Sequence, residues 1–319
     1  MFSNIVTLTD FIIKEEHTHH NTTGHLSLLL THLENCAKII ASHLRRNGLS
    51  DFLGNNGNTN IYGDEVQKLD EFANELLVNT FKESKLVTLI GSEELEEPIH
   101  ISDTHAKYSI FFDPIDGSSN IDTNASTGTI FSIYKNSNQQ YPLGSEQIIA
   151  GYILYGASTI FVYTSGQEVN GFTLDPSIGS FILSNPKITI PEKGYTYYMN
   201  EAYFNLLDDN HKNYLNFLKA KVKEYKQRST GCFIADIHQI FQKGGIFMYP
   251  ADTSSPHGKL RLLYEINPIA FLIQKAGGRS ISSRQDPLLV QPNGPNHQLP
   301  FVCGSKENMK EYLKFMISV

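Results

Sequence analysis

The sequence lacks the features that mark secreted and membrane-spanning proteins. Its 319 residues include only three cysteines, Cys36, Cys232 and Cys303, which lie far apart and form no C-x-x-C pair. This usage favours a reducing compartment and structural thiols. The N-terminus has no basic stretch followed by an apolar one, so it predicts no secretory signal. No apolar run approaches the roughly 20 residues that a transmembrane helix needs. The cytoplasm is therefore the expected location.

The chain also lacks an excess of positive charge. Its formal net charge of −7 argues against nucleic acid and anionic membrane surfaces as partners. Hydrophobic residues make up 40% and charged residues 18%, as in an ordinary soluble globular protein. No internal repeat or low-complexity tract is visible, and the length is sufficient for two domains. A small anionic ligand would need compensating cations.

The hydrophobic pattern predicts an α/β protein. Apolar residues recur every three or four positions over about 25–46 and again after Asp64, which predicts two amphipathic helices. Mainly antiparallel strands are predicted by short apolar runs at 86–90, 108–112, 128–134, 148–156, 159–164, 171–174 and 180–183. Further helices are predicted at 206–225, 234–242 and 269–275, and strands at 246–249 and 260–264. The segment 186–194 is the predicted boundary between a domain of residues 1–192 and a domain of residues 193–319.

The most informative segment is Phe112–Asn120, with the sequence FDPIDGSSN. It follows an apolar run, so Asp113 and Asp116 are expected where a buried strand emerges into a turn. Pro114 fixes the backbone between them, and Gly117 permits a left-handed turn. Two such carboxylates repel each other unless a cation lies between them, and a hard ion such as Mg²⁺ takes oxygen ligands. An ordinary Asp-Pro/Asp-Gly surface turn is the alternative interpretation.

This segment resembles the metal-binding motif of the Mg²⁺-dependent, lithium-sensitive sugar-phosphate phosphatases, which include inositol monophosphatase. Three further segments narrow the resemblance to the class I fructose-1,6-bisphosphatases: GDEVQKLD at 63–70, GGIFMYP at 244–250 and GKLRLLYEINPIAFLIQKAGG at 258–278. The order and spacing of these segments hold from about residue 23 to residue 304. The resemblance implies the layered α-β-α-β-α sugar-phosphatase fold with mixed and antiparallel sheets. It also implies Mg²⁺-dependent hydrolysis of the 1-phosphate of fructose 1,6-bisphosphate to fructose 6-phosphate and phosphate, in gluconeogenesis.

The resemblance implies a carboxylate-rich site for two or three Mg²⁺ ions, with Mn²⁺ or Zn²⁺ as alternative ions. The implied metal ligands are Glu93, Asp113, Asp116 and Glu265, together with the carbonyl of Ile115. The residues implied to act on the attacking water are Asp70 and Glu94, with Asp64 completing a site from a mobile loop. Without the resemblance, the acidic run 93–97 is most simply a solvated patch. Glu265 differs because it lies in an apolar context, where an unpaired charge is unfavourable.

The resemblance further implies a substrate pocket. Its implied members are Asp116, Gly117, Ser118, Ser119, Asn200, Tyr203, Arg228, Tyr249, Lys259 and Arg261. The two serines would hold the reacting phosphate, and they are also predicted to cap a following helix whose N-terminal amides face an anion. Lys259 and Arg261 are two apart on a predicted strand, so they are expected on one side of it.

The phosphate distant from the reaction would be bound by Asn200, Tyr203, Tyr249 and Lys259. The two tyrosines, taken without the resemblance, are better explained by core packing. Arg228 would reach into a neighbouring subunit's site, which implies at least a dimer, and a homotetramer built as a dimer of dimers is expected. The family usually has Arg-Tyr where this chain has Arg228-Ser229. We therefore expect weaker binding of the distal phosphate.

An AMP effector site is also implied by resemblance. Its implied members are Thr23, Gly24, Leu26, Ser27, Lys107 and Tyr108. His25 replaces the usual acidic residue of the AMP-binding turn, and Lys135 stands where arginine is common, so a bidentate contact is lost. The sequence therefore predicts AMP inhibition that is weaker than is typical of the family.

Two alternatives accompany this interpretation. The first is a related phosphatase that acts on sedoheptulose 1,7-bisphosphate or inositol monophosphate. The second is a catalytically inactive regulatory protein that keeps the fold. The GKLRLLYE and GGIFMYP segments favour the fructose enzyme over other substrates. The intact carboxylates argue against an inactive protein, because a cluster of like charges is unfavourable without a metal.

Overall fold

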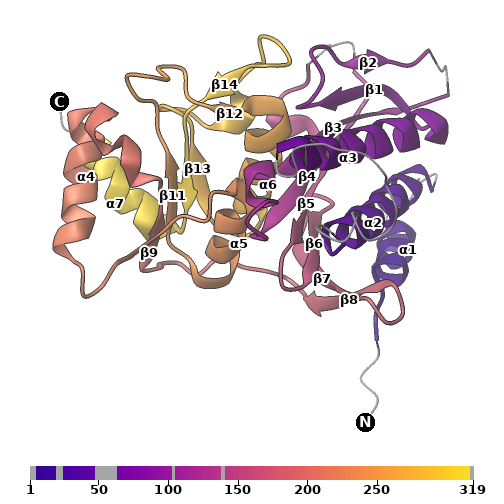
Figure 1. Cartoon of the computed structure of the whole chain (residues 1–319), viewed down its shortest axis with the longest axis horizontal. Coiled ribbons are helices and arrows are strands. Elements are labelled where there is room, and N and C mark those ends of the chain that lie inside the picture. The colour runs from indigo at the N-terminus through magenta and orange to yellow at the C-terminus, as the bar shows by residue number, and fades with distance from the viewer. Residues whose placement is uncertain (1–4, 19–23, 47–62, 103–104, 138–140, 317–319) are drawn as a thin grey trace.

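The structure is a computed structural model of the whole chain. It describes residues 5–18, 24–46, 63–102, 105–137 and 141–316, with the backbone alone for 17–18 and 63–68. Within these ranges no helix has both the length and the apolar character needed to cross a bilayer. The elements form five layers, with helices outside and between two sheets (Figure 1).

The larger sheet has eight strands and is mostly antiparallel. In sheet order its strands are β2 (Ile99–His100), β1 (Val87–Ser92), β3 (Tyr108–Asp116), β4 (Thr127–Lys135), β5 (Gln147–Tyr155), β6 (Thr159–Thr164), β7 (Val169–Asp175) and β8 (Ser180–Asn185). The pair β1 and β3 is parallel. This sheet confirms the predicted run of strands, because its strands are buried apolar segments separated by turns. Strand β3 runs four residues further than predicted, to Asp116, with a register shift against β4 between Asp113 and Asp116.

The smaller sheet has five strands and is mixed. In sheet order its strands are β10 (Lys226–Arg228), β9 (Thr196–Tyr198), β11 (Ile246–Tyr249), β15 (Phe301–Gly304) and β13 (Arg279–Ile281). The neighbours β10, β9 and β11 run parallel, so their carboxyl ends lie at one edge. A separate two-stranded ribbon pairs β12 (Leu260–Arg261) with β14 (Gln298–Leu299).

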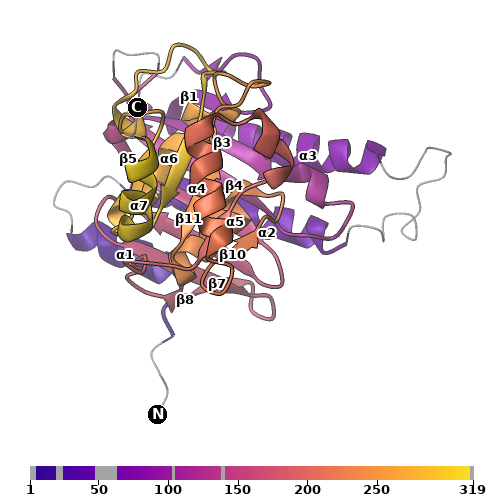
Figure 2. The same cartoon turned by 90° about the vertical axis from the view of Figure 1, so that its left-hand side faces the viewer.

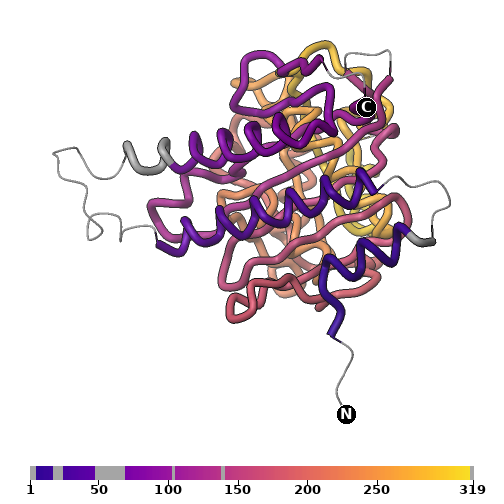
Figure 3. Tube along the Cα trace, turned by 90° about the vertical axis from the view of Figure 1, so that its right-hand side faces the viewer, coloured from indigo at the N-terminus to yellow at the C-terminus, as the bar shows by residue number. Residues whose placement is uncertain are grey.

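The helices complete the layers. They are α1 (Leu8–Thr18), α2 (His25–Leu44), α3 (Gly63–Ser84), α4 (Asp209–Ala220), α5 (Phe233–Lys243), α6 (Asn267–Lys275) and α7 (Lys306–Met316). Figure 3 shows α1, α2 and α3 side by side over the outer face of the larger sheet. Helices α5 and α6 contact strands of both sheets, and α4 and α7 cover the outer face of the smaller sheet (Figures 1 and 2). The predicted α-β-α-β-α fold is confirmed.

Three apolar cores fill the spaces between the layers. One core joins α1–α3 to the larger sheet, with Phe81 and Phe112 fully buried in it. The second surrounds α5 and α6 between the sheets, and the third joins α4 and α7 to the smaller sheet. Burial on both faces explains why most strands read as continuous apolar runs rather than as alternating ones.

The structure departs from the predicted secondary structure in several places. Helix α1 was not predicted. Its residues 14–18 are polar, so the apolar spacing of the first turns does not continue long enough to show a helical period. The predicted helix 206–225 is shorter, since Glu201–Leu206 forms a 3-10 helix before α4 begins. The predicted strand 260–264 continues for only two residues and then becomes the π-helix Leu262–Ile266. All residues of that π-helix are buried, and an apolar run buried on every side carries no period that separates strand from helix.

Candidate active site

The first group of acidic residues lies at the carboxyl ends of two parallel strands. Ser92 at the end of β1 is opposite Phe112 in β3, and the amide of Glu93 donates to the carbonyl of Phe112 at 3.0 Å. Glu93 therefore lies beside Asp113, which is fully within β3 and buried. Adjacent ends of parallel strands are a common place for ligands, because side chains from distant segments converge there.

Glu265 joins this group from the second half of the chain. One carboxylate oxygen from each of Glu93, Asp113 and Glu265 lies within 4.8 Å of the other two. Glu265 is positioned by the π-helix Leu262–Ile266, a rare element that is frequent at functional sites. The amide of Arg261 donates to Oε2 of Glu265 at 2.6 Å, and the Arg261 guanidinium forms an ion pair with Glu93. Arg261 therefore touches the acidic cluster itself.

The acidic cluster is electrostatically crowded. Burial raises the pKa of Asp113 well above its usual value, and the neighbouring carboxylates raise it further; these are Asp116, Glu265, Asp70 and Glu94. Burial raises the pKa of Glu265 to about 8. Burial and the charge of Glu94 raise the pKa of Asp70 to about 6, against a hydrogen bond from Ser118. Burial likewise raises the pKa of Glu94.

The residues present fit a hard divalent cation. Their donor atoms are carboxylate oxygens, which Mg²⁺ and similar ions prefer. The Oδ1 atom of Asp70 is buried and has no hydrogen-bond partner in the described part of the chain. A bound cation would offset the mutual repulsion that raises the pKa of Asp113. Ile115 is buried in β3 between the two aspartates, so its carbonyl belongs to the same segment.

Asp116 has contacts that the sequence did not predict. Its Oδ2 accepts hydrogen bonds from the amide of Ile234 at 2.6 Å and from the Cys232 thiol at 3.1 Å. Its Oδ1 accepts one from the amide of Phe233 at 3.3 Å. Burial raises the pKa of Asp116, and these hydrogen bonds oppose that shift. Asp116 is thus held against the first turn of α5, and no sequence signal pointed to Cys232 as its partner.

The turn after Asp116 is only partly as predicted. Gly117 has a φ of 73°, which confirms the left-handed turn, and a Cβ there would lie 2.6 Å from the Cβ of Cys232. Ser118 and Ser119 begin a single 3-10 turn, Ser118–Asn120, whose first residue has no side-chain cap. The predicted capping by the serines was therefore wrong.

The second group of predicted residues lies at the carboxyl ends of the three parallel strands of the smaller sheet. Arg228 ends β10, Asn200 follows β9 by two residues, and Tyr249 ends β11. The side chain of Asn200 accepts a hydrogen bond from the amide of Ala202 at 3.0 Å. Arg228 is exposed at the edge of the sheet. The same strand-end geometry that gathers the carboxylates therefore gathers these residues.

Lys259 contacts two tyrosines of the proposed substrate pocket. Its Nζ lies 3.9 Å from the ring centre of Tyr203 and 5.9 Å from that of Tyr249. It also lies 3.8 Å from Oδ2 of Asp252, a partner that sequence reasoning missed. Burial raises the pKa of Tyr249, and the charges of Glu265 and Asp116 add to that shift, so this tyrosine is close to the acidic cluster. Lys259 and Arg261 were expected on one side of a shared strand, and this prediction was wrong. Lys259 precedes β12, and its contacts differ from those of Arg261.

The predicted AMP-site residues and Asp64 lie away from these two groups or outside the described side chains. Gly24, Leu26 and Ser27 lie at the start of α2, where Ser27 donates to Glu16 of α1 at 2.5 Å. Tyr108 begins β3 opposite Lys135 of β4, and Lys107 precedes it. Thr23 lies outside the described residues, and Asp64 lies in α3 where only the backbone is described.

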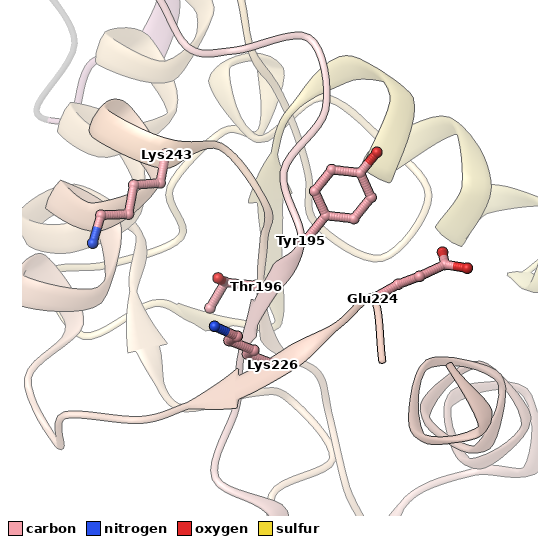
Figure 4. Close-up of a pocket in the computed structure, with 5 residues that line it drawn as sticks. All are labelled: Tyr195, Thr196, Glu224, Lys226 and Lys243. Atoms are coloured by element: carbon pink, nitrogen blue, oxygen red, sulfur yellow. The ribbon is translucent and has the colours of Figure 1, made fainter. Parts of the chain in front are cut away.

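A separate surface hollow of about 560 Å³ opens beside β9 and β10. Its lining residues are Tyr195, Thr196, Glu224, Lys226 and Lys243 (Figure 4). None of these is a predicted site residue. Lys226 lies on the edge strand and Lys243 in the last turn of α5, where a cation suits the helix dipole.

Comparisons with known proteins agree along the whole chain. Residues 6–186 match the family profile described as Fructose-1-6-bisphosphatase, N-terminal domain, and residues 190–317 match the profile of its C-terminal domain. The fructose-1,6-bisphosphatase class 1 of Persephonella marina is 45% identical over 318 residues, covering 97% of this chain and 98% of that protein. That of a Sulfurihydrogenibium species is 46% identical over 316 residues, covering 97% of each.

Solved structures give the same result for the fold. The Leishmania major fructose-1,6-bisphosphatase in the T-state superposes with a TM-score of 0.90 at 34% identity, covering 99% of this chain and 100% of that one. Its holo form gives a TM-score of 0.89 at 36% identity, covering 98% and 99%. By sequence and by fold, the chain belongs to the class 1 fructose-1,6-bisphosphatase family.

Proposed function

We propose that this protein hydrolyses the 1-phosphate of fructose 1,6-bisphosphate to fructose 6-phosphate and phosphate, in gluconeogenesis. The observation that carries the proposal is that the carboxylates at the ends of β1 and β3 lie close to the pocket residues at the ends of the smaller sheet's parallel strands. Glu93 and Asp113 lie at the ends of β1 and β3, and Tyr249, at the end of β11, is close enough for Glu265 to shift its pKa. A carboxylate cluster beside a cationic and aromatic pocket suits a substrate with phosphates at both ends.

The carboxylates would hold Mg²⁺, with Mn²⁺ or Zn²⁺ as alternatives. The proposed ligands, for two or three ions, are Glu93, Asp113, Asp116, Glu265 and the carbonyl of Ile115. When bound, such ions supply Lewis-acid stabilisation of phosphoryl oxygens and of the leaving oxygen. The support is the convergence of three carboxylates within 4.8 Å and the buried, unpartnered Oδ1 of Asp70.

The chain's own residues would orient the reactants. Asp70 and Glu94 are proposed to orient the water and to accept its proton, and a pKa of about 6 for Asp70 suits a general base near neutral pH. The water oxygen would bond to phosphorus while the bond from phosphorus to the C1 oxygen breaks, and the leaving C1 oxygen would take up a proton from solvent to become the hydroxyl of fructose 6-phosphate. Gly117, Ser118 and Ser119 would hold the reacting phosphate. Asp64 is proposed to complete the site.

The distal phosphate would be bound at the ends of the smaller sheet. Its proposed partners are Asn200, Tyr203, Tyr249 and Lys259, with Arg261 between this pocket and the carboxylates. Arg228 is proposed to act in a neighbouring subunit, and its exposure on an edge strand supports that role. A homotetramer built as a dimer of dimers follows from this proposal, and sedimentation analysis of the purified protein tests it.

Three further expectations remain proposals. The first is a pair of domains, residues 1–192 and 193–319; the two family profiles meet between 186 and 190, which supports it. The second is a weak AMP site at Thr23, Gly24, Leu26, Ser27, Lys107 and Tyr108. The third is a cytoplasmic location, predicted from the use of cysteine.

The deciding experiment is phosphate release from fructose 1,6-bisphosphate with Mg²⁺, repeated with EDTA and with two other substrates, fructose 6-phosphate and inositol monophosphate. Metal-dependent release from the bisphosphate alone is the expected result. Release from a monophosphate would overturn the substrate assignment but keep the metal site. A parallel assay with sedoheptulose 1,7-bisphosphate tests the nearest alternative. No release from any substrate would return the inactive regulatory protein as the better interpretation.

A further inference from the structure

The loop that follows β10 connects the exposed Arg228 to the start of α5. The carbonyl of Arg228 accepts a hydrogen bond from the amide of Met199 at 3.3 Å, so the loop begins beside β9. It ends at Cys232, the residue that precedes α5. Arg228 itself is the last residue of β10, where it pairs with Tyr198 of β9, so the loop begins directly after it.

Asn120 ties this loop to the segment that carries the aspartates. Its Nδ2 donates to the carbonyl of Thr230 at 2.9 Å and to the carbonyl of Ser126 at 3.0 Å. Gly231 has a φ of 77°, and a Cβ there would lie 3.1 Å from Oδ1 of Asn120. One amide side chain therefore bridges the 3-10 turn after Asp116 and the loop that begins at Arg228.

Further hydrogen bonds fix the rest of the loop. The amide of Thr230 donates to Oδ1 of Asp236 at 3.2 Å, and the Thr230 hydroxyl donates to the carbonyl of Cys232 at 3.1 Å. Cys232 is buried, and its thiol donates to Asp116. The amide and the carbonyl of Thr230 therefore both have hydrogen-bond partners. Asp236, the partner of the amide, lies in α5, whereas Asn120, the partner of the carbonyl, lies outside both the loop and α5.

We propose that Asn120 is a positioning residue for Arg228. By holding the carbonyl of Thr230, it fixes the direction in which Arg228, two residues earlier, is presented to the distal phosphate. Affinity then comes from preorganisation, because the loop need not be ordered when substrate binds. The inference rests on the proposed function, in which Arg228 binds that phosphate. Asn120 would thereby connect the metal-binding segment of one subunit to the phosphate pocket of the neighbouring subunit, which Arg228 enters.

The test compares substrates with and without the distal phosphate. Asn120→Ala and Asn120→Asp are assayed on fructose 1,6-bisphosphate and on fructose 1-phosphate. Asn120→Asp keeps the size of the side chain and loses the donor, so it serves if the alanine variant does not fold. We expect KM for the bisphosphate to rise about tenfold, the effect of losing a hydrogen bond of about 1.4 kcal/mol, with kcat changed less than about twofold. Both constants for fructose 1-phosphate should stay unchanged.

Two controls separate positioning from a general structural effect. Asn213→Ala, in the exposed face of α4, removes an asparagine far from the loop and should change neither substrate's constants. The affinity for fructose 6-phosphate, measured by calorimetry without turnover, should fall about tenfold in Asn120→Ala. Adding Asn120→Ala to Arg228→Ala should raise KM no further, since the two residues act through one contact.

The outcomes are distinguishable. Equal losses on both substrates, an unchanged KM for the bisphosphate, or an additive double variant would each overturn the positioning role. A wild-type protein that hydrolyses no bisphosphate would instead overturn the proposed function.

Discussion

The amide of Ile234 donates to Oδ2 of Asp116 at 2.6 Å, and this bond joins two halves of the chain that are 118 residues apart. Asp116 is a proposed metal ligand in β3, and Ile234 lies in the first turn of α5 between the sheets. Hydrogen bonds to a helix N-terminus favour a carboxylate, because the helix dipole and the free amides both point at it. The metal-binding segment is therefore hydrogen-bonded to the helical layer between the two sheets.

The first prediction concerns Asp113. Asp113→Asn should lower kcat at least about 100-fold, because it removes an oxygen donor from the centre of the cluster. In EDTA the same variant should unfold at a higher temperature than wild type. The reason is that it removes a carboxyl group whose ionisation is opposed by burial and by the neighbouring carboxylates, both of which raise its pKa. Asp122→Asn, exposed in the adjoining turn, is the control and should change neither property. A variant with wild-type activity would show that Asp113 holds no metal.

The second prediction concerns pH and Glu265. Its pKa is raised from 4.5 to about 8, so over that range the native chain keeps a proton that the unfolded chain loses. The free energy of unfolding should then fall as pH rises, by about 1 kcal/mol per pH unit from this group. His238, whose pKa burial lowers from 6.5 to about 4, acts in the opposite direction only below pH 6.5.

Urea unfolding in EDTA between pH 6.5 and 8 therefore measures the effect. Glu265→Gln should show a slope that is smaller by about 1 kcal/mol per pH unit. Added Mg²⁺ should reduce the slope for wild type, because a cation replaces the proton. Equal slopes for wild type and Glu265→Gln would contradict the assignment.

The third prediction concerns Gly117. Gly117→Ala places a methyl group 2.6 Å from the Cβ of Cys232 in a backbone with φ of 73°. Gly179→Ala has a similar φ of 66° but nothing within 4 Å. Gly179→Ala should destabilise by roughly 1 kcal/mol from backbone strain alone, and Gly117→Ala by about 2 kcal/mol more from the steric clash. Chemical unfolding of both variants measures the difference, and equal losses would show that the contact with Cys232 relaxes freely.

The fourth prediction concerns Ser229. Ser229 is exposed beside Arg228, and its hydroxyl is too short to reach where a tyrosine would. Ser229→Tyr should lower KM for fructose 1,6-bisphosphate about threefold to tenfold, with kcat little changed, because one hydrogen bond to a charged phosphate is added. Ser229→Phe adds the ring without the hydroxyl and should leave KM near the wild-type value. An unaltered KM in Ser229→Tyr would count against the role of this position.

The fifth prediction concerns AMP. Lys135 lies opposite Tyr108 in the pairing of β3 with β4. Lys135→Arg should lower the AMP concentration for half inhibition by about threefold to fivefold, since a guanidinium contacts phosphate bidentately. Lys187→Arg is the matched control, because Lys187 is exposed two residues beyond the end of β8 and pairs with Glu168. Insensitivity of all three proteins to AMP would show that the effector site is absent.

The sequence by itself determined the layers and the chemical types at the site. Burial on both faces left long apolar runs at the strands, and three- and four-residue periods marked α2 and α3, so these elements could be predicted. The motif around Asp113 and Asp116 predicted a metal site through its resemblance to the phosphatase family, because the residues alone left an ordinary surface turn as an alternative. The left-handed turn after Asp116 could be predicted from Gly117, because glycine adopts positive φ without strain.

Only the tertiary structure decided which groups meet. The π-helix that positions Glu265 lies in a run that is buried on every side and so has no readable period. Cys232 and Ile234 donate hydrogen bonds to Asp116, and Asn120 donates one to Thr230. Each of these bonds joins residues more than 100 positions apart in the sequence. Such contacts use backbone groups and short side chains that every sequence contains. Local pattern cannot reveal them, because the packing of α5 between two sheets is what brings the partners within hydrogen-bond distance.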